Sequence, residues 1–145
     1  MPATFSEMGL NFLYPENWKL QKAEDASEEG EGVILELPSG GFLSIERVAS
    51  DENIASIIDQ LTAAFQEEYG EIETEDLAAD SESLPGVKSA VDFRFYYLDL
   101  LIVSRFMLIQ VSDVAFALQF QAENRDFEEN ELVVSAVLKQ ISSAA

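Results

Sequence analysis

Apolar and polar positions alternate with a period of two near the start of the chain, and this period is typical of strands. The first such run covers residues 10–14 and ends at Pro15, where a proline-containing turn begins. A short second strand is expected at residues 18–20. The following stretch, 24–32, carries acids and two glycines and is predicted to be a loop.

A β-hairpin is the next predicted element. Runs of β-branched, aromatic and aliphatic residues at 33–37 and 42–48 flank the turn sequence Pro-Ser-Gly-Gly at 38–41. In the second of these strands Leu43 and Ile45 are expected to face the core. The alternation therefore predicts a sheet with one buried face at this point.

The period then changes to steps of three and four residues, which predicts a helix over 54–69. Asp51 and Glu52 stand at its start, where the helix dipole favours negative charge, and Gly70 stands where a left-handed residue commonly closes a helix. Its single apolar stripe is predicted to consist of Ile54, Ile57, Ile58, Leu61, Phe65 and Tyr69.

Strand patterns return in the second half of the chain. The acidic segment 71–80 has the composition of an edge strand, because charges on an edge prevent unwanted pairing. A turn at 81–86 is followed by a predicted three-stranded meander. Its strands are 91–97, 100–111 and 114–120, with a tight turn at Ser112-Asp113. The strand 100–111 is apolar on both faces in its first half, which favours a central position.

A second helix is predicted over 126–141 at the end of the chain. Asp126 is its expected N-cap, with Glu129 at the capping-box spacing and Lys139 near the negative C-terminal end. Its apolar stripe is predicted to be Leu132, Val133, Ala136, Val137 and Ile141. Two helices with one apolar stripe each are buried most simply by packing on the sheet. We therefore expect one α+β domain, residues 1–145, with an antiparallel sheet and two main helices.

The charge of the chain restricts its partners. Eight Lys and Arg residues face 28 Asp and Glu residues, which gives a formal net charge of −20. This field repels nucleic acid and anionic membrane surfaces, whereas it permits basic partners or serves solubility alone. The N-terminal segment lacks the basic and apolar regions of a signal peptide, so a cytoplasmic location is expected. A chain whose leader had been removed would give the same pattern.

The residue types that carry most catalytic chemistry are missing. The chain contains no Cys and no His, which excludes Ser-His and Cys-His nucleophiles, structural zinc and most transition-metal sites. No phosphate-binding glycine loop and no EF-hand pattern occurs. Acids are abundant, but they lie in polar runs typical of solvated surface. We predict no cofactor and no enzyme activity; a carboxylate-dependent hydrolase is the alternative in that class.

Aromatic residues are the remaining candidates for a functional site. Tyr14, Trp18, Tyr96 and Tyr97 combine large apolar area with a polar group, which suits a partner-binding surface. The competing interpretation places them in the core and on the sheet faces. Small and amide side chains on the last strand leave room on one sheet face for a helix or a groove: Ala115, Ala117, Gln119 and Gln121.

The start of the chain resembles a known family. The segment 10–17, Leu-Asn-Phe-Leu-Tyr-Pro-Glu-Asn, followed by Trp18, is similar to the F-x-Y-P-x-x-W opening of Mog1/PsbP-like domains, which include the DcrB-like bacterial proteins. The element order, with a late strand ending at Phe120, also matches over nearly the whole chain. The resemblance implies an α/β/α sandwich around an antiparallel sheet of about six or seven strands.

The resemblance also implies a noncatalytic binding or accessory role. Members of the family bind a small GTPase, assist photosystem II, or act as chaperones for effectors of type VI secretion by shielding hydrophobic helices. We therefore expect a protein or peptide partner, either basic or with a hydrophobic segment, and no membrane insertion. A cytosolic chaperone for a secreted effector is the alternative. No functional residue of the family is carried over, because the matched Tyr14-Pro15 and Trp18 positions are structural in character.

Overall fold

The structure is a computed structural model of the chain, and it describes residues 2–6, 9–22, 32–48, 54–79, 81, 84–111 and 114–143. Three predictions fall outside these residues: most of the acidic loop at 24–32, the acids at 51–52 and the turn at 112–113. In the described part, apart from an added first strand, strands and helices follow one another in the order that the sequence predicts.

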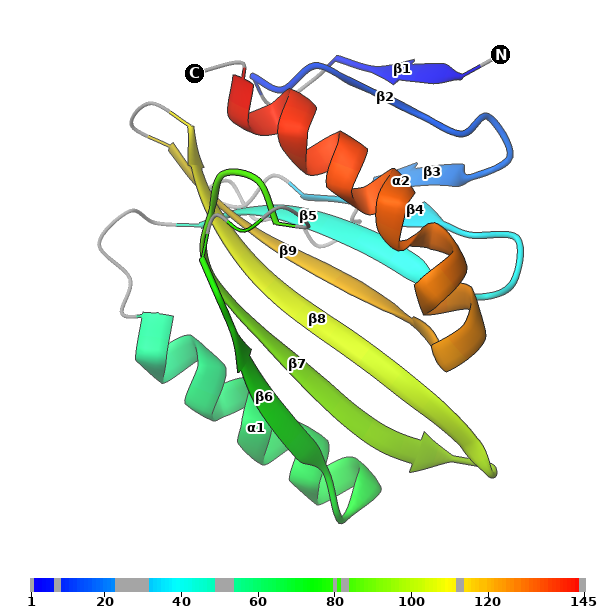
Figure 1. Ribbon diagram of the computed structural model, residues 1–145, viewed down its shortest axis with the longest axis vertical. Helices are drawn as coiled ribbons and strands as arrows, with labels where there is room; N and C mark the ends of the chain where they lie inside the picture. Colours follow the sequence, from blue (N-terminus) through cyan, green and yellow to red (C-terminus); the bar gives the residue numbers. More distant parts are fainter. Residues whose placement is uncertain are drawn as a thin grey trace.

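A seven-stranded antiparallel sheet forms the centre of the fold (Figure 1). Its strand order is β3-β4-β5-β9-β8-β7-β6, so the last strand of the chain lies in the middle and joins the N-terminal hairpin to the meander. The strands are β3 (Lys19–Lys22), β4 (Gly32–Glu36), β5 (Phe42–Val48), β6 (Glu73–Leu77), β7 (Val87–Tyr97), β8 (Leu100–Val111) and β9 (Val114–Glu123). The predicted edge strand is confirmed as β6.

Two short strands form a separate ribbon at the start of the chain. The strand predicted at 10–14 is β2 (Phe12–Tyr14), and it pairs with β1 (Ala3–Phe5), a strand that the sequence did not predict. Phe5 stacks on Phe12 with ring centroids 4.9 Å apart, which fixes the ribbon by its rings. The ribbon lies beside the C-terminal helix (Figure 1).

The two helices cover opposite faces of the sheet, which confirms the α+β class. Helix α1 (Ile54–Tyr69) packs on β7, and α2 (Asn124–Ser143) crosses β8 and β9 on the other face (Figure 1). No helix among the described residues is long and apolar enough to span a membrane.

The larger core lies between α2, the ribbon and the sheet. Leu43 and Ile45 of β5 are fully buried there, as their alternation predicts. Side chains of α2 enter this core at Phe127, Val134, Val137, Leu138 and Ile141. On the other face the predicted stripe of α1 packs on β7, β8 and β9 and remains partly exposed. The packed residues of this stripe are Ile57, Ile58, Leu61 and Phe65.

Two predictions for α2 are wrong. The helix begins at Asn124 rather than Asp126, and its first turn is capped from the preceding strand, where the Glu123 carboxylate accepts a hydrogen bond of 3.0 Å from the Arg125 amide. The predicted stripe is wrong in part, since Val137 and Ile141 are buried and Val133 packs on the core as predicted, but two of its members do not. Leu132 and Ala136 are exposed, and Val134 and Leu138 take the buried positions.

The predicted burial of β8 is also displaced along the strand. The buried run is 103–109, in the middle of the strand, whereas Leu100 at its start is exposed. The reason is that β7 and β8 extend beyond the ends of the neighbouring strands and form a hairpin whose tip lies at the edge of the molecule (Figure 1). The strand is an interior one, between β7 and β9.

Candidate functional site

The four aromatic residues predicted to form a partner-binding surface do not lie on one surface. Trp18 is only 4% exposed and belongs to the core, and Tyr14 is buried beside the ribbon. Tyr96 and Tyr97 are exposed at the end of β7, far from the ribbon (Figure 1). The prediction is therefore corrected for Trp18 and Tyr14, whose rings are buried in the core.

The turn between β7 and β8 has an unusual backbone for its residues. Tyr97 pairs with Leu100, so the loop consists of Leu98 and Asp99, with φ of 50° and 66°. Both central residues of a type I′ turn need positive φ, which is why Asn-Gly dominates such turns. An L-residue in this region costs about 1–2 kcal/mol. Leu98 therefore has a strained backbone, and burial of its side chain in the core does not compensate for the strain.

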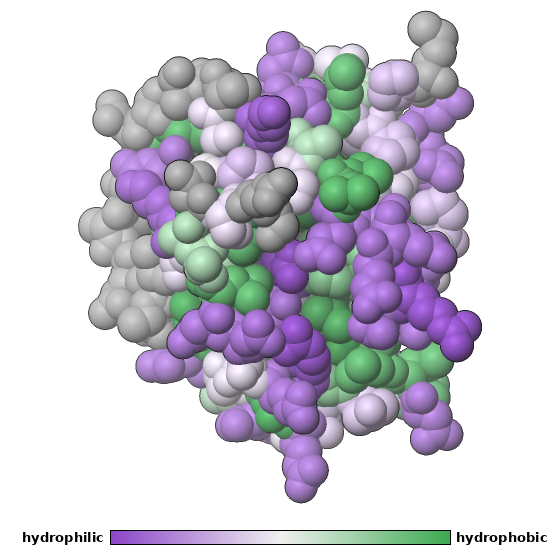
Figure 2. Space-filling model, viewed as in Figure 1, coloured by the Kyte–Doolittle hydropathy of each residue, from purple (hydrophilic) through white to green (hydrophobic). Residues whose placement is uncertain are grey.

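The side chains at this turn are large, apolar and exposed. Leu98 is 78% exposed and Tyr96 is 67% exposed, and Tyr97 and Leu100 are each at least half exposed. We call these four residues the hairpin tip. Figure 2 shows a largely hydrophilic surface with separate hydrophobic patches, one of them at the lower right, toward the end of the molecule that carries this turn in Figure 1.

A ladder of rings fixes the base of the hairpin tip to α1. Tyr69, at the end of α1, stacks on Phe95 with ring centroids 4.1 Å apart, and Tyr97 meets Tyr69 edge-on at 6.0 Å. Burial, followed by the negative charge of Glu68, raises the pKa of the Tyr69 hydroxyl. The tip is therefore held in one position by contacts on its α1 side, while its outer side chains remain free of the core.

A cavity of about 530 Å³ adjoins the hairpin tip where α1 ends and β6 begins. Tyr96 and Leu101 line one side, and Glu71 and Glu73 line another. Arg94 also lines it, and its guanidinium contacts Glu75 at 3.1 Å. The surroundings of the tip are thus mixed, with carboxylates beside apolar surface.

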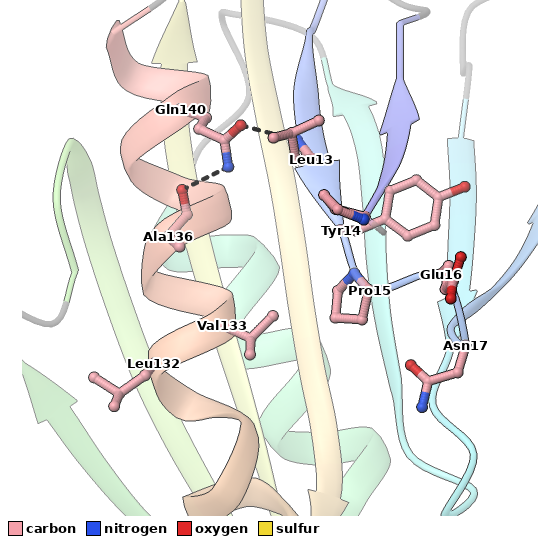
Figure 3. A pocket seen from close by; sticks show the side chains of 10 residues that line it. Leu13, Tyr14, Pro15, Glu16, Asn17, Leu132, Val133, Ala136 and Gln140 are labelled. Carbon is pink, nitrogen blue, oxygen red and sulfur yellow. Dashed lines mark hydrogen bonds between the residues drawn. The ribbon is translucent and has the colours of Figure 1, made fainter.

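A second hollow surface lies between α2 and the segment that follows β2 (Figure 3). It has a volume of about 720 Å³ and is mainly apolar, and we call it the α2–β2 groove. One end is fixed by Gln140, whose Oε1 accepts a 2.9 Å hydrogen bond from the Leu13 amide. Val133 points across the groove toward Pro15 in Figure 3, and Leu132, 83% exposed, lies at the rim.

A buried charge cluster joins α2 to the sheet. Asp92 is 1% exposed, and Arg105 on the paired strand donates to both of its carboxylate oxygens, at 2.7 and 3.0 Å. Arg105 also contacts Glu131 of α2 at 3.0 Å and lies over the Phe127 ring. Burial alone would lower the pKa of Arg105, but the hydrogen bonds and charges of the two acids outweigh burial and raise it.

This cluster stabilises the fold, because ion pairs of Arg105 join α2 to the sheet. Among the described residues Asp92 is the one buried acid, and its carboxylate is paired with a fixed cation. The described residues contain no group of three acids placed to hold a metal ion and no buried side-chain polar atom without a partner.

Leu98, Leu100 and Leu132 were missed by the sequence interpretation. A leucine in a two-residue turn was the available signal for Leu98, because Asn or Gly is expected there. Leu132 was assigned to the buried stripe of its helix, and its exposure could not be seen before the helix was placed on the sheet.

Comparison with known proteins gives a similarity of fold. No family model and no curated protein matches the chain. The solution structure of cyanobacterial PsbP (CyanoP) from Synechocystis sp. PCC 6803 matches with a TM-score of 0.61 and 13% sequence identity, over 96% of this chain and 90% of that one. At this level of identity the similarity extends to the fold alone.

Two further solved structures match less well. PA94, a protein of unknown function from Pseudomonas aeruginosa, has a TM-score of 0.45 and 13% identity, over 95% of this chain and 94% of that one. LpqN, involved in cell envelope biogenesis of Mycobacterium tuberculosis, has a TM-score of 0.35 and 13% identity, over 99% of this chain and 82% of that one.

Proposed function

We propose that this chain, whose fold is that of a Mog1/PsbP-like domain, is a noncatalytic module that binds a protein partner through the hairpin tip. The observation that carries the proposal is Leu98, which is both strained, with φ of 50°, and 78% exposed. Strain that persists without a structural benefit is typical of functional sites. Asn or Gly at this position would remove both the backbone strain and the exposed apolar side chain.

The composition and rigidity of the hairpin tip support this role. Tyr is enriched at the centres of protein interfaces, because its ring buries much area with little loss of side-chain freedom. Tyr97 is already fixed against Tyr69, so a partner would not have to order it. The tip is the end of the β7–β8 hairpin, which extends to the edge of the molecule (Figure 1) and suits a partner with an apolar cleft.

The buried charge cluster supports a noncatalytic role. A hydrolase that uses carboxylates needs one acid kept protonated in an apolar place and a second across the substrate. Asp92 is the buried acid of the described residues, and the Arg105 guanidinium lies between it and Glu131. Both carboxylates are therefore engaged by one guanidinium, and neither lines the two cavities described above.

Affinity capture from a lysate of the source cells, with quantitative mass spectrometry, tests the proposal. L98S keeps an L-residue in the strained turn and removes only the apolar side chain. L20S is the control, because it changes an exposed leucine on β3, at the opposite edge of the sheet from β6 and β7. We expect L98S to reduce the captured partner about tenfold or more, as for an interface hot spot, and L20S to retain it. Equal capture by wild type and L98S would contradict the proposal, as would an equal loss with L20S.

A chaperone for a secreted effector is the second candidate, favoured by the apolar α2–β2 groove. Such a chaperone shields a hydrophobic segment of its client, so the captured protein would carry an exposed apolar helix. Loss of capture with L132S and not with L98S would favour this candidate.

A further inference from the structure

We propose that the α2–β2 groove is a second binding site, separate from the hairpin tip, and that its occupant is a peptide segment with leucine-type side chains and a Lys or Arg at one end. The groove is open, apolar and formed by two elements that are fixed to each other. The Gln140 side chain joins them, since it accepts a hydrogen bond from the Leu13 amide and donates one of 3.2 Å to the Ala136 carbonyl (Figure 3). The site is therefore present before any ligand arrives.

The apolar part of the groove fits aliphatic side chains. Val133, Ala136, Pro15 and Leu13 line it together with Leu132, whose 83% exposure leaves nearly its whole side chain for a ligand to cover. A leucine this exposed contributes little to folding. When an apolar side chain of the ligand covers Leu132, the binding free energy becomes more favourable by about 1 kcal/mol or more. This corresponds to a several-fold to tenfold gain in affinity.

The charged residues in and beside the groove are mainly acidic. Glu16 is the one charged residue of the lining and lies on the segment after β2, across from α2 (Figure 3). Glu128 and Glu129 are exposed and lie four and three residues before Leu132, so they occupy the same side of α2. With a net charge of −20, the protein attracts a cationic segment and places its positive end near Glu16.

Two substitutions of similar size at the exposed Ala136 distinguish the effect of charge on peptide binding from the effect of obstructing the groove. Ala136 is exposed and lines the groove, and both Glu and Lys are good helix formers. A136E and A136K obstruct the groove to a similar extent but differ in sign. For a cationic peptide we expect A136K to bind about tenfold more weakly than A136E. A difference of less than twofold would contradict a cationic occupant.

Three labelled synthetic peptides serve as probes in fluorescence anisotropy at physiological salt. The first carries leucines at helical spacing with arginines at one end, the second replaces the arginines by glutamates, and the third replaces the leucines by serines. We expect saturable binding of the first alone. Equal binding of the serine peptide would mean non-specific attraction to an acidic protein, and absence of binding by all three would also overturn the proposal.

Separate readouts distinguish this site from the hairpin tip. L98S is expected to leave peptide binding unchanged, whereas L132S weakens it several-fold. Circular dichroism of each variant shows whether the fold is kept. Binding of an apolar dye in the groove, with no binding of the leucine-arginine peptide, would identify a small-molecule site and contradict a peptide occupant.

Discussion

The guanidinium of Arg105 holds both carboxylate oxygens of Asp92 inside the fold, with Nε to Oδ1 at 2.7 Å and Nη2 to Oδ2 at 3.0 Å. The two residues are direct cross-strand partners on β7 and β8, beneath the first turns of α2. Glu131 reaches the same guanidinium from α2, so one cation joins the sheet to the helix. The helix that shapes the α2–β2 groove is therefore positioned by charge as well as by its apolar stripe.

Removal of Asp92 is expected to destabilise the protein strongly. D92A leaves Arg105 buried without its main partner, and breaking a buried pair in this way costs about 3–5 kcal/mol. E131Q is the control, because Glu131 is about one-third exposed, and it is expected to cost less than about 1 kcal/mol. Urea unfolding measures both, and a D92A cost as small as that of E131Q would show that the pair contributes little.

Stability at alkaline pH should depend on Tyr69. Its pKa is raised in the folded state, so the folded protein holds the hydroxyl proton more tightly than the unfolded chain does. This contribution is complete below the ordinary tyrosine pKa of about 10 and is lost as pH rises through the folded-state pKa. Thermal unfolding between about pH 8 and pH 11 should show a steeper decline for wild type than for Y69F. Parallel declines would contradict the raised pKa.

A close contact at Gly86 should make that position far less tolerant than Gly9. Both glycines have φ of 76°, so the backbone strain of an alanine is the same at each. A Cβ at Gly86 would overlap the Cβ of Ser142 near the end of α2, whereas a Cβ at Gly9 meets nothing within 4 Å. G86A is expected to lose about 1–3 kcal/mol more than G9A. The added variant S142G should recover part of that difference, and failure of this rescue would contradict the contact.

The sequence predicts the elements of this fold well because each has one strong period. The alternation of Val91, Phe93 and Phe95 defines β7, and the Ile57 to Phe65 stripe defines α1. In α2 two neighbouring stripes compete, one through Leu132 and Ala136 and one through Val134 and Leu138. The choice between them is made by the position of the sheet, which local periodicity does not contain.

The candidate site is less accessible from sequence for the same reason. Asp92 and Arg105 are recognised as partners only when the register of β7 and β8 is known. Tyr96 and Tyr97 were identified by residue type, whereas the sign at Leu98 was a leucine between two predicted strands where Asn or Gly is expected, and its backbone conformation is what shows the strain. Trp18 has the composition of an interface residue and lies in the core, because burial depends on elements distant in sequence.

The most direct test of the hairpin tip is a single variant, L98N, measured for stability and for partner capture in parallel. Asn is well accommodated at positive φ, so L98N is expected to raise the free energy of unfolding by about 0.5–1 kcal/mol while it removes the exposed apolar side chain. We predict a more stable protein that captures about tenfold less of its partner. A stabilised L98N protein with undiminished capture would contradict a binding role for the hairpin tip.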